Sequence, residues 1–232
     1  MTADHPLNAL LAETDSPLAQ PLPEEALARF DAYLALLVRW NARTNLTAIR
    51  KPEEILRRHF LESVLVARAL PPGIGTLLDY GSGAGFPGLP ISICRMEIAV
   101  TLAESQHKKA AFLREAVRTV GLAVAVHAER AERLSTQFDC VTLRAVDRME
   151  LAVASAARLL KPGGWLAAMT TQDRAETVRE SAKQAANRAA GQSRGGEGMD
   201  LSKSIYTIHW NPSFSLLPGT SEQLLLGQYD FA

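Results

Sequence analysis

In Thr76-Leu77-Leu78-Asp79-Tyr80-Gly81-Ser82-Gly83-Ala84-Gly85-Phe86-Pro87-Gly88, a short apolar run leads through an acidic residue into a turn with glycine at alternate positions. The pattern predicts a strand, a tight loop and the start of a helix. Glycines at 81, 83 and 85 allow positive φ angles and carry no Cβ, so a ligand can lie directly against the backbone. We interpret this as a nucleotide-binding turn. By itself such a loop is a weak signal, because a tight turn is the alternative.

The residues around this loop favour a cationic ligand over a dinucleotide. A pyrophosphate needs free backbone N–H donors at the start of a helix, and Pro87 and Pro90 remove two of them. Asp79 places a negative charge beside the loop, which repels an anion and attracts an ammonium or a sulfonium group. S-adenosylmethionine has both groups, so we expect the loop to hold this cofactor.

A second acidic residue indicates a nucleoside. Glu104 follows the apolar-rich run 98–103, at the end of the next predicted strand. A carboxylate about 20 residues beyond a glycine loop can accept hydrogen bonds from a ribose diol. NAD enzymes use the same device, so Glu104 does not identify the nucleoside. A solvated acid in a strand-to-helix turn is the alternative.

The composition is that of one α/β domain with an appendage. The 232 residues are 47% hydrophobic and carry 25 basic and 25 acidic side chains, so bulk charge predicts no nucleic-acid affinity and any such binding needs a local patch. Cys94 and Cys140 lie in apolar runs without metal-ligand spacing, which predicts core thiols, no metal site and a reducing cytoplasm. No apolar stretch approaches the roughly 20 residues of a membrane span, and no export signal is expected.

The chain divides into three parts by pattern. Residues 1–23 contain four prolines among small and polar residues, which predicts a mobile tail with at most one helical turn. Residues 24–71 predict an N-terminal helical segment, with helices that begin near Pro23 and Pro52. Residues 72–232 predict the ligand-binding domain, with a flexible loop near 190–200.

Strands and helices alternate in this domain, which predicts a mostly parallel, doubly wound sheet. The pattern predicts helices at 87–95, 108–120, 131–134 and 149–160, and strands at 98–103, 123–127, 138–143 and 165–169. The last two predicted strands, 205–210 and 223–228, have no helix between them. Such a terminal hairpin favours the seven-stranded methyltransferase sheet over the six-stranded parallel dinucleotide sheet.

The N-terminal helical segment has a local excess of basic residues. From Arg29 to Arg68 there are eight bases and four acids. A solvated helical face and a surface that contacts RNA phosphates both have this pattern.

Motifs spread from about residue 25 to 230 resemble those of one family. They are Trp40-Asn41, Thr44-Asn45-Leu46-Thr47-Ala48-Ile49, His59-Phe60-Leu61-Glu62-Ser63, the glycine loop from Asp79 to Pro90, Glu104-Ser105, Lys108-Lys109, Phe112-Leu113, Arg130-Ala131-Glu132, Phe138-Asp139 and Arg144-Ala145. The chain resembles the bacterial ribosomal RNA small-subunit methyltransferase G family, also called glucose-inhibited division protein B. The glycine loop recurs in methyltransferases generally, whereas the Asn-Leu-Thr element and the Phe-Pro-Gly continuation point to this family.

The resemblance implies an α/β, Rossmann-like, seven-stranded class I S-adenosylmethionine-dependent methyltransferase fold with an N-terminal helical extension. It implies methyl transfer from S-adenosylmethionine to N7 of one guanine in a conserved loop of 16S rRNA, as free RNA or in the small ribosomal subunit. By position, Gly81 and Phe86 would line the cofactor, Ala131 and Glu132 would meet its adenine, and Arg144 would face both cofactor and target. Tyr80, Leu143 and Gln223 depart from the usual family pattern.

Two sets of candidate site residues follow from these motifs and patterns. Those expected to contact the cofactor are Asp79, Gly81, Gly83, Gly85, Phe86, Glu104, Ala131, Glu132 and Arg144. Those expected to contact RNA are Arg43, Asn45, Arg50, Lys51, Arg57, Arg58, Lys108 and Lys109.

The expected chemistry needs placement rather than proton transfer. Guanine N7 carries a free lone pair, so no general base is expected among the histidines. Arg144 is the candidate for target placement, because its planar fork can bond guanine O6 or a phosphate. An ion pair with Asp147 or Glu132 is the alternative role for this arginine.

Three other classes of function stay open. Pro87 and Asp79 disfavour an NAD-dependent oxidoreductase of the same sheet type. Arginines in the N-terminal helices disfavour the apolar lid of a small-molecule methyltransferase, and an RNA-binding module without catalysis would leave the methyl group untransferred. We expect a monomer, since RNA must reach the cleft.

Overall fold

A central sheet organises the molecule. The computed structural model describes residues 2, 4–14, 16–146, 148–192, 206–211, 213–217 and 220–231. Its strands follow the order β3 (Ala125–His127), β2 (Ala99–Ala103), β1 (Thr76–Tyr80), β4 (Phe138–Arg144), β5 (Leu160–Thr171), β8 (Glu222–Phe231) and β6 (Tyr206–Trp210). The first five are mutually parallel, and β8 runs antiparallel to both β5 and β6.

This order confirms the predicted seven-stranded sheet and its terminal hairpin. One short strand was not predicted: β7 (Phe214–Ser215) pairs with β8 beside β6. The strand predicted at 165–169 begins earlier, at Leu160, because the turn at 161–164 lies within β5 as an irregularity in its pairing with β4.

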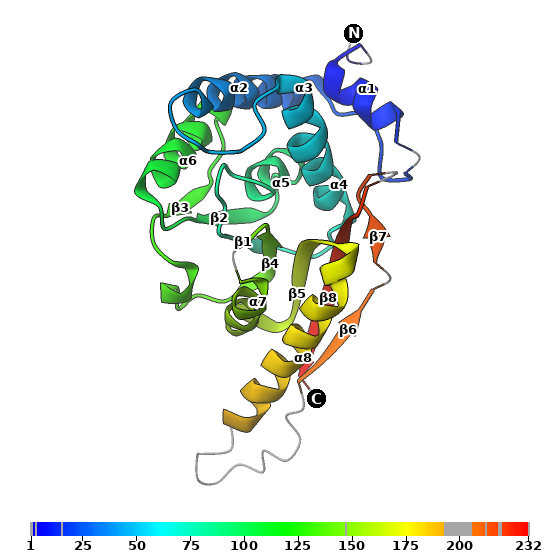
Figure 1. The fold of residues 1–232 in the computed structure, drawn as a ribbon, viewed down its shortest axis with the longest axis vertical. Coiled ribbons are helices and arrows are strands. Elements are labelled where there is room, and N and C mark those ends of the chain that lie inside the picture. Colours follow the sequence, from blue (N-terminus) through cyan, green and yellow to red (C-terminus); the bar gives the residue numbers. More distant parts are fainter. Residues whose placement is uncertain are drawn as a thin grey trace.

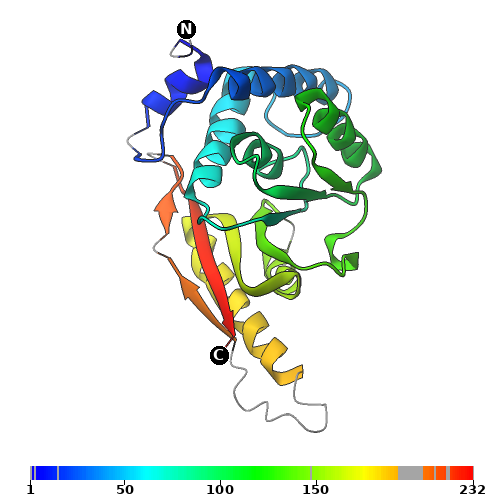
Figure 2. The same ribbon diagram turned by 180° about the vertical axis from the view of Figure 1, so that it is seen from behind.

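Helices cover both faces of the sheet (Figures 1 and 2). On one face, the core includes residues of α2 (Glu24–Asn41), α4 (Glu62–Ala69), α5 (Gly88–Cys94) and α6 (His107–Val120). The other face is covered by α7 (Met149–Arg158) and α8 (Ala175–Gln192). Leu77 and Leu78 point into opposite cores, which explains why β1 is apolar on both sides.

The first 23 residues do not form a free tail throughout. A helix, α1 (Pro6–Ala12), packs Leu7 and Leu11 into the core with no exposed surface. The side chain of Asn8 accepts a hydrogen bond from Leu22 N at 2.8 Å and donates one to Leu22 O at 3.2 Å. The proline-rich composition therefore did not predict this packed helix, and the expectation of a mobile tail is wrong for α1.

The second predicted N-terminal helix changes its winding along its length. It starts as α3 (Pro52–Ile55), continues as a π-helical stretch, η1 (Leu56–Leu61), and ends as α4. A π turn shifts the direction of the side chains that follow it and is frequent at functional sites. Here the π-helical stretch lies against the end of β4, because Arg58, His59 and the adjoining Glu62 all contact Arg144.

Two further expectations concern the rest of the chain. The predicted flexible loop near 190–200 lies outside the described residues from position 193 on, where α8 has ended. Within the described part of the chain, no helix combines the length and apolar character that crossing a membrane requires.

Candidate functional site

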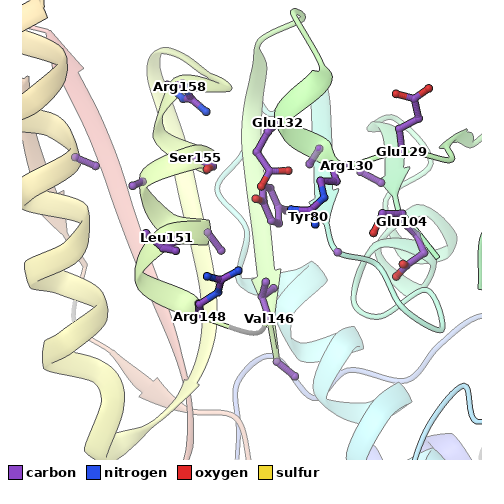
Figure 3. A pocket seen from close by; sticks show the side chains of 18 residues that line it. Tyr80, Glu104, Glu129, Arg130, Glu132, Val146, Arg148, Leu151, Ser155 and Arg158 are labelled. Atoms are coloured by element: carbon purple, nitrogen blue, oxygen red, sulfur yellow. The ribbon is translucent and has the colours of Figure 1, made fainter.

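A cavity of about 730 Å³ opens at the carboxyl ends of β1, β2 and β4. Ligands of open α/β sheets bind at this edge, where the strand order reverses. Figure 3 shows the lining side chains, with Tyr80, Arg130 and Glu132 in the middle of the view. Of the predicted cofactor residues, four line the cavity: Gly81, Glu104, Ala131 and Glu132.

The glycine loop uses its N–H groups internally. Gly81 N and Ser82 N both donate to Ala103 O, at 3.0 and 2.9 Å, and Gly85 N and Phe86 N both donate to Ser82 O. Gly83 N donates to Glu104 Oε2 at 3.0 Å. A pyrophosphate would therefore find none of these five donors free, which agrees with the expected preference for a cationic ligand.

Glycine is required at position 85 by both conformation and space. The φ angle of Gly85 is +96°, and a Cβ there would lie 2.7 Å from Tyr33 Oη. Tyr33, on α2, donates a hydrogen bond from this hydroxyl to Ala84 O. The N-terminal helical segment thus holds the glycine loop directly. Gly81 and Gly83 also have positive φ angles, as predicted.

Glu104 fits the predicted role in nucleoside binding. Its side chain is buried, and its two oxygens accept backbone hydrogen bonds, Oε2 from Gly83 and Oε1 from Gln106 at 2.7 Å. A carboxylate oxygen has two lone pairs, so each keeps acceptor capacity on the cavity wall. These acceptors therefore suit the hydroxyl donors of a ribose diol, and the residues present fit S-adenosylmethionine.

Asp79 does not line the cavity. Its carboxylate is 1% exposed and accepts hydrogen bonds from Thr142 Oγ1 at 2.8 Å and from Gly88 N at 3.2 Å. Burial raises the pKa of this carboxyl to about 6, while Thr142, Ser82 and Gly88 oppose the shift. Its contacts show that Asp79 ties β1 to β4 and to the start of α5 beneath the loop.

Tyr80 belongs to the cavity wall. Figure 3 shows its ring beside Glu132. Burial raises the pKa of the phenol to about 12, and the Glu132 carboxylate adds to the effect. The hydroxyl is therefore a neutral donor next to the residues expected to meet adenine.

Arg144 lies at the end of β4 in a buried polar cluster. Its Nη2, which carries two hydrogens, donates to Glu62 Oε2 at 2.6 Å and to Arg58 O, and it lies 3.1 Å from His59 Nδ1. Its Nη1 is buried and has no partner among the described residues. The alternative of an ion pair is realised, but with Glu62 in place of Glu132. Asp147 lies outside the described residues.

His59 is held as a neutral ring. His59 Nδ1 lies 3.1 Å from both Arg144 Nη2 and Arg58 O, and its Nε2 lies 2.8 Å from Thr47 Oγ1. Burial lowers the pKa of His59 to about 3, and the charge of Arg144 lowers it further. The ring thus links the Asn-Leu-Thr element to Arg144.

Phe86 packs in an aromatic cluster rather than on the cavity wall. Its ring stacks on His59 at 4.8 Å and on Tyr33 at 5.3 Å between centroids. The guanidinium carbon of Arg144 lies 5.9 Å from the centroid of Phe86. Phe86 therefore connects the glycine loop to the cluster around Arg144.

Most of the predicted RNA-contacting residues already have partners. Arg50 donates to Asn45 Oδ1 at 2.7 Å, Lys51 lies 3.6 Å from Glu54, and Arg57 pairs with Glu13 at 2.8 Å. Arg58 pairs with Glu62 at 3.2 Å and with Glu222. Three have side chains without a hydrogen bond or ion pair to any described residue: Arg43, Lys108 and Lys109.

Sequence reasoning missed the α7 side of the cavity. Arg148, Leu151, Ser155 and Arg158 line it, together with Val146 and Arg130. The recurrence at three- and four-residue spacing marks one helix face, but no feature of the sequence says what that face meets. No group of three or more potential metal ligands occurs among the described residues.

Comparison with known sequences identifies the family. Residues 26–194 match the family model described as "GidB: rRNA small subunit methyltransferase G". The chain is 47% identical over 156 residues to the ribosomal RNA small subunit methyltransferase G of Xanthomonas euvesicatoria pv. vesicatoria (strain 85-10), covering 65% of this chain and 72% of the relative. It is 44% identical over 182 residues to the protein of the same name from Stenotrophomonas maltophilia (strain K279a), covering 72% and 80%.

Solved structures support the fold. A methyltransferase from Pyrococcus furiosus matches with a TM-score of 0.54 at 13% identity, covering 88% of this chain and 98% of that one. Pyrococcus horikoshii TYW2 in complex with MeSAdo matches with a TM-score of 0.57 at 16% identity over 75% of this chain, which spans only 63% of that structure's length. The class I methyltransferase fold is therefore confirmed. Together with the family match, these findings show that the chain belongs to the rRNA small subunit methyltransferase G family.

Proposed function

We propose that this protein transfers a methyl group from S-adenosylmethionine to N7 of a guanine in 16S rRNA. The observation that carries the target assignment is the buried Nη1 of Arg144, an unpartnered donor at the end of β4. The next two residues of the chain, Ala145 and Val146, line the cavity. Donor and cofactor cavity therefore adjoin, as a transfer between two bound molecules requires.

The cavity offers separate surfaces to the parts of the cofactor. Glu104 would accept hydrogen bonds from the ribose, and Ala131, Glu132 and Tyr80 would surround the adenine. Gly81 would let the methionine part approach the backbone, since only Val146 atoms lie within 4 Å of the position of a Cβ there. When bound, the cofactor supplies an electrophilic methyl group on a sulfonium.

The residues around Arg144 have to place the guanine rather than activate it. Guanine N7 attacks with a lone pair that carries no proton, so no side chain has to act as a base. His59 lies between Thr47 and Arg144, at 2.8 and 3.1 Å, which suits a structural role. Orientation of two reactants alone can lower a barrier by about 7–11 kcal/mol.

Arg144 is suited to this placement. Glu62 and Arg58 O hold Nη2, so one side of the fork is fixed and Nη1 keeps its hydrogens free. A guanidinium donates to guanine O6 and N7 in known modes of base recognition, and N7 must stay free here, so O6 is the acceptor. Arg144 would thereby select guanine and leave N7 facing the methyl group.

Labelled methyl transfer tests the proposal. The purified protein is incubated with S-adenosylmethionine labelled on the methyl group and with naked 16S rRNA or purified small ribosomal subunits. Label should enter one guanine, and mild borohydride and aniline treatment should cleave the RNA there, because N7 methylation opens the ring to that chemistry. Label without cleavage would contradict the N7 assignment, and absence of label from both substrates would contradict the function.

Two finer points belong to the same proposal. The enzyme acts as a monomer, because a second copy over the cavity would block RNA, and it needs no metal ion. Light scattering coupled to size exclusion should give the mass of one 25.2 kDa chain. Activity should survive treatment with EDTA when the rRNA is folded beforehand in a monovalent salt.

A further inference from the structure

Opposite charges occupy opposite walls of the cavity. Figure 3 shows Glu104 and Glu129 on one side and, on the other, Arg148, which is the N-cap of α7, with the α7 residues Leu151, Ser155 and Arg158. We refer to these four residues as the α7 wall. Arg130 and Glu132 lie between the two sides. The cavity therefore presents two different surfaces for binding.

The acidic side chains of the cavity contact other groups of the protein, whereas the arginine side chains form no ion pair within the described residues. Glu104 accepts two backbone hydrogen bonds, Glu129 pairs with Arg133 at 2.9 Å, and Glu132 faces Tyr80. Arg130, Arg148 and Arg158 make no ion pair with any described residue, although all three are exposed at the cavity. Three unneutralised guanidinium groups around one opening favour an anionic partner.

The cofactor alone does not explain these arginines. S-adenosylmethionine has one carboxylate and no phosphate, so a single guanidinium would neutralise it. Arg148 and Arg158 are ten residues apart, or about 15 Å along the helix axis. At this separation the two arginines would contact different anionic groups. Successive phosphates of a nucleic-acid strand are such groups.

Leu151 adds an apolar contact between the two arginines. It is 57% exposed, one of the few large hydrophobic side chains that the described surface leaves open. Single-stranded RNA binds proteins through phosphates held by basic residues and through unstacked bases or sugars packed on side chains. Arg148 at the N-cap of α7, Leu151 within the helix and Arg158 at its end match such an alternation.

We propose that the α7 wall and Arg130 bind the phosphates of the RNA strand that flanks the target guanine. The inference rests on the proposed function and adds an RNA-contact surface outside the basic N-terminal helices. An unstacked target base requires a locally single-stranded segment, which the α7 wall would hold across the cavity mouth. Arg144 would then select the base while the α7 wall holds its backbone.

The test compares RNA binding with cofactor binding in one double variant. Arg148→Ala/Arg158→Ala should raise the Kd for in vitro transcribed 16S rRNA roughly tenfold, and the slope of log Kd against log salt should fall by about 1.4, or ~0.7 for each lost phosphate contact. Arg148→Lys/Arg158→Lys should restore most of the slope. The Kd for S-adenosylmethionine from calorimetry should change less than about twofold, because the acidic wall is intact.

A matched control and two opposing outcomes make the test decisive. Lys183→Ala removes one exposed positive charge from α8, outside the cavity lining, and should leave the salt slope unchanged. An unchanged rRNA Kd and slope in the double variant would overturn the inference. Loss of cofactor binding with unchanged RNA binding would also overturn it and assign the arginines to the cofactor. If wild-type protein binds rRNA but transfers no label, the proposed function fails instead.

Discussion

Arg144 Nη2 and Glu62 Oε2 lie 2.6 Å apart and join the end of β4 to the first turn of α4. The Glu62 side chain is buried at 1% exposure, and the Arg144 side chain is mostly covered at 15%. Removing one partner of a buried ion pair is costly because the other charge is left uncompensated. The pair therefore makes the position of Arg144 depend on the N-terminal helical segment.

Arg144→Ala should lower methyl transfer about a hundredfold or more, because loss of target placement affects the reacting geometry directly. Cofactor affinity should change little, since Arg144 does not line the cavity. Single-turnover rates and calorimetric Kd values measure the two effects separately. Arg39→Ala, which removes an exposed arginine paired with Glu115, is the matched control. Equal losses of rate and cofactor affinity would place Arg144 in the cofactor site.

Methyl transfer should depend on pH through Glu62. Burial raises the pKa of this carboxyl to about 7, although Arg144 and Arg58 oppose the shift. The ionised form that pairs with Arg144 is therefore present above pH 7 and lost as the pH falls below it. The single-turnover rate should rise between about pH 6 and 8 in wild-type protein.

Glu62→Gln is the test of that assignment. The amide cannot titrate, so the rate should be low and nearly independent of pH across the same range. Glu176→Gln is the control, because Glu176 is an exposed acid of α8 that pairs with Arg179 and is not among the charges that act on Glu62. A pH profile that persists in Glu62→Gln would show that another group titrates.

Gly85→Ala should weaken cofactor binding by disturbing the glycine loop. A residue other than glycine at a φ of +96° costs about 1–3 kcal/mol, and the new Cβ would meet Tyr33 Oη at 2.7 Å. Gly121→Ala separates the two causes, because Gly121 also has a positive φ but nothing within 4 Å of its Cβ position. It should lose stability without losing cofactor affinity.

Tyr33→Phe completes this comparison. It removes the hydrogen bond to Ala84 O, at a cost of about 1 kcal/mol, and it opens space for the new Cβ. The cost of Gly85→Ala should therefore be smaller in the Tyr33→Phe background when a double-mutant cycle is measured by urea unfolding. Additive costs would show that the contact with Tyr33 does not matter.

The sheet and the glycine loop were predictable because their signals are local. Alternating strands and helices, a terminal hairpin and glycines at 81, 83 and 85 each appear within a few residues. The same holds for Glu104, whose spacing from the loop follows from one strand, one helix and the next strand. The helix α1 was underestimated, because its burial comes from partners such as Leu22 rather than from its own seven residues.

The cluster around Arg144 was not predictable in the same way. Glu62 is 82 residues away in sequence from Arg144. The π-helical stretch at Leu56–Leu61 also changes the directions in which the following side chains point, compared with a regular α-helix. Arg58 was expected to meet RNA, yet it pairs with Glu62 and Glu222. The sequence pattern around an arginine on a helix is the same whether the arginine binds RNA or pairs with an acid from a distant strand.

Asp139→Asn should destabilise the fold in a pH-dependent manner. Asp139 Oδ2 accepts hydrogen bonds from Gly75 N, Thr76 N and Thr76 Oγ1, and Oδ1 accepts one from Lys161 Nζ at 2.9 Å. These contacts join the starts of β1 and β4. Burial opposes ionisation, but the bonds from Lys161 and Thr76 outweigh it and lower the pKa of Asp139 to about 2.

The sign of the effect follows from that lowered pKa. The stabilisation is present above the unfolded-state value of 3.8 and is lost as the pH falls towards 2. At pH 7 the variant should lose about 2 kcal/mol in urea unfolding, and the deficit should shrink by pH 3 because Asp139 of the unfolded wild-type chain is then mostly protonated while the native carboxylate is still ionised. Asp173→Asn, at an exposed acid, should change stability little at either pH. An equal deficit for Asp139→Asn at pH 7 and pH 3 would mean that packing, and not the charge of Asp139, stabilises this corner.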